Sequence, residues 1–324
     1  MNVLVTGGAG FLGGNAMSAL AAAGHNAIAY DIASPSDEIL AVAPSLASSC
    51  RSGSIDDISR LVEVCRAERI EAIVHTAGRV GLGPSLADPV AFYQTNIMGL
   101  VNVCEAARQL GVRKLISISS NAAYHTGIGE KLNESDPTFS ITGANPAGHY
   151  GTSKMAGEAI GMAYAAFHDV DFLALRVTAI YGFGMRSPIY VKPMVEGAVL
   201  GKPVHFSSGG PMKRDYTHVF DCCDAIVMAI DAPRWKPGTQ RILNISAGRT
   251  CTAAEISAIV RHVIPGANIT IGDGLTPLEQ ANVQMRAPLD ISAAKRLLGW
   301  SPKWRIEDGI RQYANRFRAY VTNS

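Results

Sequence analysis

Charge is scarce in this chain of 324 residues: Asp, Glu, Lys and Arg make up only 17%, and the formal net charge is +2. Polyphosphate and anionic membranes are bound by clustered excess positive charge, so this balance argues against a nucleic-acid or membrane-surface protein. Long apolar runs are also missing, because no stretch approaches the roughly 18 consecutive apolar residues of a membrane-spanning helix. With 48% hydrophobic residues, the chain can instead build a large buried core.

Cysteine and histidine lack the spacings of a disulfide framework or a metal site. The six cysteines contain no CxxC pair, and the eight histidines contain no HExxH. We therefore expect reduced, buried thiols and no metal. The N-terminal MNVLVTGG has no basic leader and enters β-type sequence at once, so we expect a fold that begins at Met1 and a cytoplasmic protein.

Short apolar runs alternate with helical patterns through the first half of the chain. The runs are nearly continuous in Val, Ile and Leu, as in strands buried on both faces of a parallel sheet. This alternation predicts a doubly wound α/β fold of Rossmann type. The expected strands are Asn2–Thr6, Asn26–Asp31, Ile70–Thr76, Lys114–Ser120 and Asp171–Thr178, and the expected helices are Phe11–Ala23, Pro89–Leu110 and Tyr150–Phe167.

After Thr178 the pattern becomes richer in Gly, Pro and Ser and then mostly helical. We expect helices at Val191–Leu200, Asp221–Asp231, Thr252–Val263, Ser292–Leu298 and Ile306–Tyr320, with one strand at Arg241–Ser246. At ~150 residues per domain the length suggests about two domains, or one large domain with an appended part. We expect residues 1–178, with about 217–246, to form the Rossmann domain, and residues 179–216 and 247–324 to form a smaller, mainly helical, interleaved substrate lobe.

A glycine pattern lies between the first strand and the first helix. Gly7, Gly10 and Gly13 form GxxGxxG, which allows a tight turn, close approach to a pyrophosphate and close helix–strand packing. The helix N-terminus then directs N–H groups and a positive dipole end at the phosphates. About 0.3 such triplets are expected by chance in this chain, so the strand–helix context carries the inference to a dinucleotide site.

An acid ends the second expected strand. Asp31 lies 18 residues after Gly13, where a carboxylate would accept the adenosine-ribose hydroxyls and repel a 2′-phosphate. No Arg or Lys occurs between Asp31 and Arg51, so we expect NAD rather than NADP as the cofactor. The alternative is that Asp31 is only a turn residue at the end of a strand.

Tyr150 and Lys154 form the chain's only Tyr-x-x-x-Lys. On a helix this spacing puts both groups on one face, and an ammonium beside a phenol lowers a pKa that is ordinarily ~10. Such a phenolate can take the proton of a secondary alcohol while hydride leaves its carbon. Ser120 ends an expected strand, at the edge where ligands bind parallel sheets, and its hydroxyl could hydrogen-bond the reacting oxygen. The alternative for the pair is an exposed helix face.

Taken together, these motifs resemble the extended short-chain dehydrogenase/reductases of the NAD-dependent epimerase/dehydratase family, which includes UDP-glucose 4-epimerase. The resemblance runs from Met1 to about Tyr313. It rests on TGGAGFLG (Thr6–Gly13), HTAGRVGLGPS (His75–Ser85), NIMGLVNVCEAA (Asn96–Ala107), SISSNAAY (Ser117–Tyr124), HYGTSK (His149–Lys154), RDYTHVFD (Arg214–Asp221) and LGWSPKW (Leu298–Trp304).

The resemblance assigns roles to individual residues. It implies that Tyr150 is the general base, that Lys154 binds the nicotinamide ribose and tunes Tyr150, and that Ser120 orients the substrate. The cofactor-binding residues that it implies are Gly7, Gly10, Phe11, Leu12, Gly13, Asp31, Ser54, Ile55, Ala77, Gly78, Asn96, Ser119, Tyr150 and Lys154, and the substrate-binding residues are Ser85, Ser120, Tyr150, Ala179, Arg214 and Arg286. It also implies a homodimer, in which the helices near Pro89–Leu110 and Tyr150–Phe167 form a four-helix bundle.

The sequence departs from the family pattern at two of these positions. Ala179 stands where many nucleotide-sugar members carry a substrate-contacting Asn, which removes one polar anchor worth ~1 kcal/mol. Ser54 stands where an acid contacts the adenine. Arg214 and Arg286 remain where family members hold the nucleotide-sugar diphosphate, unless they only form surface or interdomain salt bridges.

Three functions remain open at this point. The leading hypothesis is an NAD-dependent sugar oxidoreductase that works through a keto intermediate, plausibly a nucleotide-sugar epimerase. A dehydrogenase that releases a keto product from a free sugar, sugar acid or other small alcohol is the alternative, and Ala179 favours it. An inactive NAD-binding regulator is a third interpretation, which the presence of Tyr150, Lys154 and Ser120 disfavours.

Overall fold

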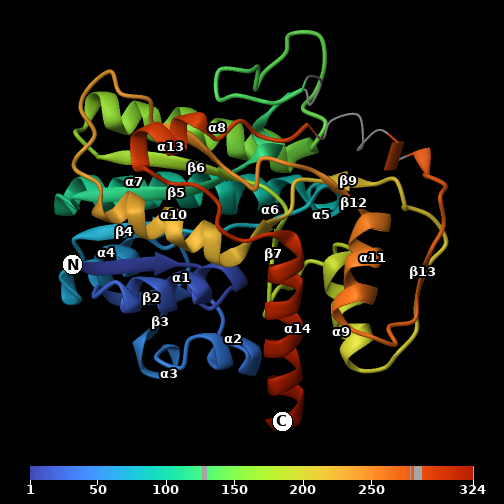
Figure 1. Cartoon of the computed structure of the whole chain (residues 1–324). Coiled ribbons are helices and arrows are strands. Elements are labelled where there is room, and N and C mark those ends of the chain that lie inside the picture. The colour runs from blue at the N-terminus through green and yellow to red at the C-terminus, as the bar shows by residue number, and fades with distance from the viewer. Residues whose placement is uncertain (126–129, 278, 281–286, 324) are drawn as a thin grey trace.

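The structure is a computed structural model that describes residues 1–125, 130–277, 279–280 and 287–323. Its centre is a seven-stranded parallel sheet with the strand order β11-β6-β5-β4-β1-β2-β3 (Figure 1). The strands are β1 (Asn2–Thr6), β2 (Asn26–Asp31), β3 (Cys50–Ser52), β4 (Ala72–His75), β5 (Lys114–Ser120), β6 (Phe172–Val177) and β11 (Ile242–Ile245). The predicted doubly wound Rossmann-type sheet is thereby confirmed.

Helices cover both faces of the sheet because successive side chains of a strand point to opposite faces. Val3 and Val5 of β1 belong to one core, and Leu4 belongs to the other. The first core lies under α1 (Phe11–Ala22), α10 (Val219–Asp231) and α13 (Ser292–Leu298). Against the second face pack α4 (Ile58–Ala67), α7 (Gly99–Leu110) and α8 (Gly148–Phe167).

A separate core lies beside the sheet. It is formed by α9 (Val191–Val199), α11 (Ala253–Val263) and α14 (Ile306–Asn323), which Figure 1 shows grouped away from the strands. Three short strand pairs accompany these helices: β7 (Ile180–Tyr181) with β10 (Thr217–His218), β8 (Val204–Phe206) with β13 (Ile269–Ile271), and β9 (Lys213–Arg214) with β12 (Cys251–Thr252). The lobe therefore contains the helices that the sequence predicts and, in addition, three two-stranded sheets that it does not predict.

One stretch of the expected lobe departs from the predicted division. Ala293, Ala294 and Trp300 pack into the first sheet core, and the Trp300 Nε1–H donates to the Asp221 carbonyl of α10 at 3.0 Å. A buried indole and its flanking alanines stabilise the side of the sheet that they cover, so residues 292–300 lie on the Rossmann core. The remaining division stays a proposal.

Some elements have no counterpart among the predicted ones. Apart from the short strand pairs of the lobe, these are α2 (Asp37–Val42), α3 (Leu46–Ser49), β3, α4, α5 (Leu82–Ala87) and the 3-10 turn η2 (Asn121–Ala123). The helical stretch expected at Pro89–Leu110 is interrupted, because α6 (Pro89–Tyr93) passes through a π-helical turn, η1 (Gln94–Met98), into α7. A π-helical turn rotates the side chains that it carries relative to the flanking helices, and such turns are common at functional sites.

The outer edge of β11 is occupied by other parts of the chain. The Asn244 backbone N–H donates to the Glu134 carboxylate at 2.8 Å, and its side-chain amide donates to the carbonyls of Leu132 and Asp290, each at 3.0 Å. Leu132 and Leu289 form a β-bridge with each other next to this edge. Side chains and loops thus take the hydrogen bonds that a further strand would take.

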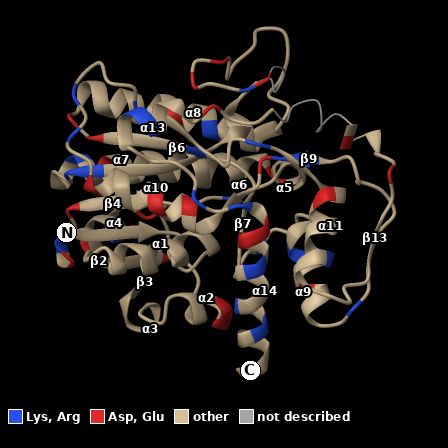
Figure 2. Cartoon of the chain, viewed as in Figure 1, with Lys and Arg blue, Asp and Glu red and all other residues tan. Residues whose placement is uncertain are grey.

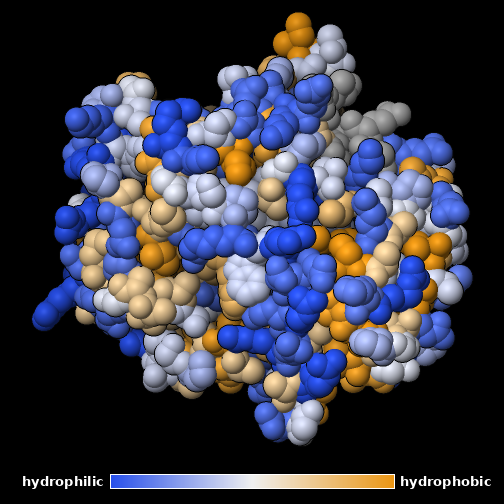
Figure 3. Space-filling view, in the orientation of Figure 1, coloured by the Kyte–Doolittle hydropathy of each residue, from blue (hydrophilic) through white to orange (hydrophobic). Residues whose placement is uncertain are grey.

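The surface is mixed in charge and polarity. Figure 2 shows Lys and Arg interspersed with Asp and Glu, as along α14, without a single-signed face in that view. Figure 3 shows mostly hydrophilic surface with apolar areas between. None of the helices in the described ranges has the length and apolarity of a membrane-spanning segment.

Candidate active site

The glycine loop between β1 and α1 is closed so tightly that side chains are excluded. Gly7 has a φ of 71°, and a Cβ on it would lie 2.7 Å from the Ala77 nitrogen. A Cβ on Gly13 would overlap the Gly7 carbonyl. Gly7 and Gly13 therefore stand where only glycine fits. The loop lies against Ala77, which follows β4, the strand next to β1 in the sheet.

The N-terminus of α1 is suited to bind an anion. Gly10 is its N-cap residue and supplies no side-chain cap, and the first N–H groups of a helix, here those of Phe11, Leu12 and Gly13, have no carbonyl within the helix to bond. These groups and the helix dipole favour a phosphate. Since β1 and β4 are neighbours although β1 also pairs with β2, the loop lies at the point where the strand order reverses, which is where Rossmann sheets bind dinucleotides.

Asp31 ends β2 and faces the glycine loop. One carboxylate oxygen accepts the Ala9 N–H and the other accepts the Ala33 N–H, both at 3.0 Å. The first bond ties the acid directly to the glycine loop, and each oxygen keeps a lone pair for a ribose hydroxyl. The carboxylate therefore has a second task, bracing the loop, that its position in the sequence does not indicate.

Ser54 and Ile55 follow β3 in a short turn. The Ser54 hydroxyl accepts the Asp56 N–H at 3.1 Å, and its carbonyl accepts the Tyr30 hydroxyl at 2.9 Å. Ile55 is buried and its carbonyl accepts the Asn102 side-chain amide at 2.9 Å. This turn is thus pinned to β2 and to α7, and a nucleotide contact from it remains a proposal.

Asn96 lies in the π-helical turn and holds the segment after β4. Its Oδ1 accepts the Arg79 N–H at 2.8 Å, and its Nδ2 donates to the Arg79 carbonyl and to the Ser153 hydroxyl, each at 3.0 Å. A Cβ on Gly78 would lie 3.1 Å from Asn96 Oδ1 and 3.8 Å from Lys154 Nζ. The loop that contains Ala77 and Gly78 therefore lies next to the predicted catalytic lysine. Asn96 holds this loop in place through its bonds to Arg79.

Tyr150, Lys154 and Ser120 meet at the carboxyl end of β5. Lys154 Nζ lies 5.9 Å from the centre of the Tyr150 ring and donates to the Ile118 carbonyl, two residues before Ser120, at 2.8 Å. The Ser120 hydroxyl accepts the Ala122 N–H at 3.1 Å and donates a long hydrogen bond to the Asn121 side-chain oxygen at 3.4 Å. The three side chains predicted for proton transfer thus occupy one edge of the sheet, on α8 and β5.

The environment of Lys154 shifts its acidity. Burial lowers the pKa of Lys154 to about 8, against the opposing effect of the Glu158 carboxylate. Burial, reinforced by the Lys154 charge, lowers the pKa of His75 to about 3, and its Nδ1 shares a hydrogen bond with the Thr6 hydroxyl at 2.8 Å. His75 is therefore neutral around pH 7, and the ammonium of Lys154 is the cation next to the phenol.

The predicted substrate residues are distributed over both parts of the chain. Ser85 is buried in α5, where its hydroxyl donates to the Leu82 carbonyl at 2.8 Å. Ala179 follows β6 with a φ of 32°, a left-handed conformation that is costly for alanine. Arg214 pairs with Cys251 across β9 and β12, and its buried Nε has no hydrogen-bond partner among the described residues. Arg286 lies outside the described residues.

A buried cluster that the sequence patterns do not indicate lies one turn beyond Lys154. Glu158 of α8 forms a bidentate ion pair with Arg176 of β6, and the Ser119 hydroxyl donates to the same carboxylate at 2.5 Å. Ser119, expected at the cofactor, thus has its hydroxyl engaged inside the protein. A glutamate and an arginine 18 residues apart match no sequence motif, so the pair could not be predicted from spacing. The one available signal is an arginine within the otherwise apolar strand β6, which must find a partner when buried.

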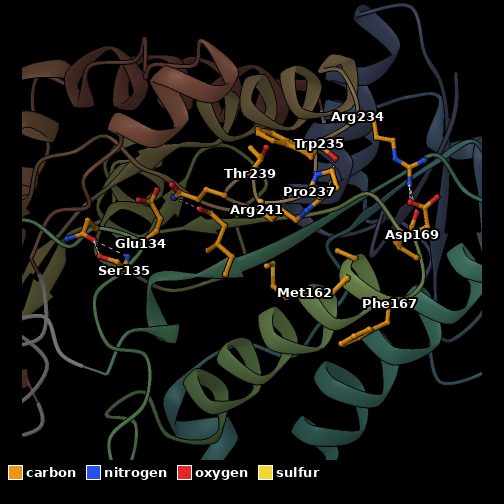
Figure 4. Close-up of a pocket in the computed structure, with 17 residues that line it drawn as sticks. Glu134, Ser135, Met162, Phe167, Asp169, Arg234, Trp235, Pro237, Thr239 and Arg241 are labelled. Atoms are coloured by element: carbon orange, nitrogen blue, oxygen red, sulfur yellow. Dashed lines mark hydrogen bonds and ion pairs between the residues drawn. The ribbon is translucent and has the colours of Figure 1, made fainter.

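A cavity of about 1040 Å³ lies elsewhere, at the amino ends of β6 and β11 (Figure 4). Met162 and Phe167 of α8 line one side and Trp235 and Arg241 the other. None of the predicted site residues lines it. Among the residues that the structure describes, no group of three or more His, Cys, Asp and Glu side chains is arranged to hold a metal ion.

Comparisons with known proteins agree on one family. The sequence profile of the NAD dependent epimerase/dehydratase family matches residues 3–246. The UDP-glucose 4-epimerase of Rhizobium meliloti is 28% identical over 327 residues, which cover 94% of this chain and 93% of that protein. The crystal structure of Thermotoga maritima UDP-glucose 4-epimerase with UDP-glucose matches with a TM-score of 0.83 and 25% identity, covering 99% of this chain and 100% of that one. Thermus thermophilus UDP-glucose 4-epimerase in complex with NAD matches with a TM-score of 0.81 and 26% identity, covering 98% and 99%.

Proposed function

The chain belongs to the NAD dependent epimerase/dehydratase family, and from this we propose that it is a nucleotide-sugar 4-epimerase whose substrate is a UDP-sugar. It is an NAD-dependent enzyme with a Rossmann-type sheet. The observation that supports the proposal most directly is the meeting of Tyr150, Lys154 and Ser120 at the sheet edge that also carries the glycine loop. The names of full-length relatives supply the substrate class.

The residues present fit NAD. The glycine loop turns so tightly that a Cβ on Gly7 or Gly13 would meet backbone atoms of Ala77 or Gly7. The start of α1 faces this loop with free N–H groups, and Asp31 retains lone pairs for the ribose hydroxyls. We propose that Lys154 holds the nicotinamide ribose. When bound, NAD accepts a hydride from the sugar carbon and returns it.

The proton chemistry belongs to the chain. Tyr150, as phenolate beside the Lys154 ammonium, takes the proton of the sugar hydroxyl, and the C–H bond of the same carbon breaks as hydride leaves. Ser120 donates a hydrogen bond to the oxygen that becomes the keto oxygen. After the ketone turns over, the hydride returns to its other face and Tyr150 returns the proton, so no net oxidation occurs.

Arg214 supports a charged substrate. Its Nε is buried without a partner in the described part of the chain, and a buried guanidinium donor without an acceptor is unfavourable unless a ligand supplies one. A diphosphate supplies acceptors of matching geometry and charge. We propose that Arg214 binds the diphosphate of the nucleotide sugar and that Ser85 and Ala179 lie along the sugar.

We further propose a homodimer through a four-helix bundle. Val90 and Met98 near α6 are 76% and 46% exposed, and Met162 and Phe167 on α8 are 38% and 81% exposed. Large apolar side chains exposed on helical segments favour burial against a partner surface. The division into a Rossmann domain and a substrate lobe, with residues 292–300 on the Rossmann side, is likewise proposed, and the cytoplasmic location stays a prediction.

The function is tested with purified protein and a panel of UDP-sugars, free sugars, sugar acids and lactones. A thermal-shift screen identifies binders, because selective binding raises apparent stability. Interconversion of a UDP-sugar without accumulation of NADH supports the epimerase. Steady NADH formation from a panel member would instead identify the dehydrogenase, and absence of turnover together with NAD-dependent capture of a protein partner would identify the regulator.

A further inference from the structure

Glu158 is a buried carboxylate held by two neighbouring strands. It lies one helical turn after Lys154, its side chain is 5% exposed, and its oxygens accept Arg176 Nε at 2.8 Å and Nη2 at 2.7 Å. The Ser119 hydroxyl donates to the same carboxylate at 2.5 Å. Three bonds from two strands therefore fix the helix that carries the catalytic pair.

The bond from Ser119 connects this cluster to the reacting groups. Ser119 lies between Ile118, whose carbonyl accepts the Lys154 ammonium, and Ser120. A shift of α8 along the sheet would therefore disturb the Glu158 bonds and the Lys154 bond together. Catalytic groups must be held within a fraction of an ångström of their working geometry, and this cluster is a buried contact, one helical turn from Lys154, that can do so.

Lys154 and Glu158 also face one enclosed space. A cavity of about 10 Å³ is lined by both side chains together with His75, Ser117, Ser119 and Ser153. The charged and titratable groups packed around the ammonium are Glu158 and Tyr150 of α8, Arg176 behind Glu158, and His75 of β4. His75 is neutral because its pKa is lowered to about 3, so Glu158 is the carboxylate that opposes the effect of burial on the Lys154 pKa.

We propose that Glu158 is a positioning residue for the catalytic pair, which anchors α8 to β5 and β6 and favours the ammonium form of Lys154 across the small cavity that both side chains line. The inference rests on the proposed roles of Tyr150 and Lys154. A purely structural ion pair would stabilise the fold and leave the acidity of Lys154 untouched. The two roles therefore differ in a pH profile.

The protein offers a matched control at the other end of the same strand. Asp171 immediately precedes β6, is fully buried, and pairs with Arg241 at 2.8 Å. Glu158→Gln and Asp171→Asn each remove one buried carboxylate from an arginine, at opposite ends of β6. Both should lower the unfolding midpoint, because each leaves a buried guanidinium without its counter-charge.

The test measures the NAD dissociation constant between pH 6 and 10, for which no substrate is needed, and then the turnover of the sugar substrate. In wild type we expect NAD affinity to fall as pH rises through about 8, when Lys154 loses its proton. Glu158→Gln should move this fall about one unit lower, since the charge that favours the ammonium is removed. Asp171→Asn should leave the midpoint unchanged.

Two further variants keep the proposal falsifiable. Glu158→Asp retains the charge and should restore the wild-type midpoint. If Glu158→Gln does not fold, the double variant Glu158→Gln with Arg176→Met removes both buried charges and should show a smaller lowering of the midpoint, because the positive charge of Arg176 is lost as well. Equal midpoints for wild type and the Gln variant would overturn the proposal, whereas loss of sugar turnover in wild type with the predicted NAD profile would overturn the proposed function alone.

Discussion

Replacement of Asp31 tests how the chain distinguishes NAD from NADP. The carboxylate is proposed to accept the ribose hydroxyls, and in the structure it also accepts the Ala9 and Ala33 N–H groups at 3.0 Å. Asp31→Ala removes both tasks. Loss of the bond to Ala9 loosens the glycine loop and should weaken NAD and NADP alike, whereas loss of the ribose bonds should weaken NAD alone. The ratio of the two dissociation constants therefore cancels the contribution of the loop.

The expected size follows from the bonds involved. Hydrogen bonds to a charged group contribute about 1.5 kcal/mol each at the lower end of their range, so two ribose hydroxyls correspond to about 3 kcal/mol, or roughly 100-fold in affinity. NADP should gain from removal of the negative charge, which offsets its loss from the looser loop. We expect the preference for NAD to fall roughly 100-fold in Asp31→Ala, and roughly tenfold in Asp31→Asn, which keeps an uncharged acceptor.

Isothermal titration of wild type and both variants with each dinucleotide measures these ratios. Thermal unfolding of the unliganded variants is the control for loop damage. If both dinucleotides weakened by the same factor, Asp31 would act only by bracing the loop at Ala9, and the assignment of ribose recognition to this carboxylate would be wrong.

Three other outcomes are expected. Tyr150→Phe should lower turnover by roughly 10³-fold, as for loss of a general base, while equilibrium titration shows NAD affinity within a few-fold of wild type. His75 has a pKa of about 3 in the folded protein and 6.5 in the unfolded chain, so between these values the unfolded chain binds more protons and the free energy of unfolding rises with pH. His75→Gln should remove this dependence, lowering the slope of the unfolding free energy against pH by up to about 1.4 kcal/mol per pH unit, as measured by denaturant unfolding. Val90→Lys with Met98→Lys should convert a dimer into a monomer in sedimentation, and an unchanged mass would remove these side chains from the interface.

The sheet was predictable because its strands are buried on both faces. In Lys114–Ser120, apolar residues lie on both sides of the pleat and all seven residues are buried. The predicted strand coincides with β5. β3 escaped prediction because Cys50–Ser52 is three residues long and carries no apolar run. The two-residue strands of the lobe are shorter than any hydrophobic period, so no pattern could indicate them.

The site was predictable where spacing reflects geometry. The glycine loop and the Tyr150–Lys154 pair are local, and helix geometry alone places the pair on one face. Long-range contacts leave no such trace: the bond from Asp31 to Ala9 and the ion pair of Glu158 with Arg176 arise only when strands and helices pack. The left-handed backbone at Ala179 is equally invisible, because alanine seldom adopts it.

The occupied outer edge of β11 has a consequence for how copies of this chain can associate. An open strand edge invites another chain to extend the sheet, which leads to fibrous growth. With the N–H of Asn244 bonded to Glu134 and its side chain bonded to Leu132 and Asp290, that route is blocked at this edge. Association through the helical faces, as in the proposed homodimer, leaves this edge unused and can close into a finite particle.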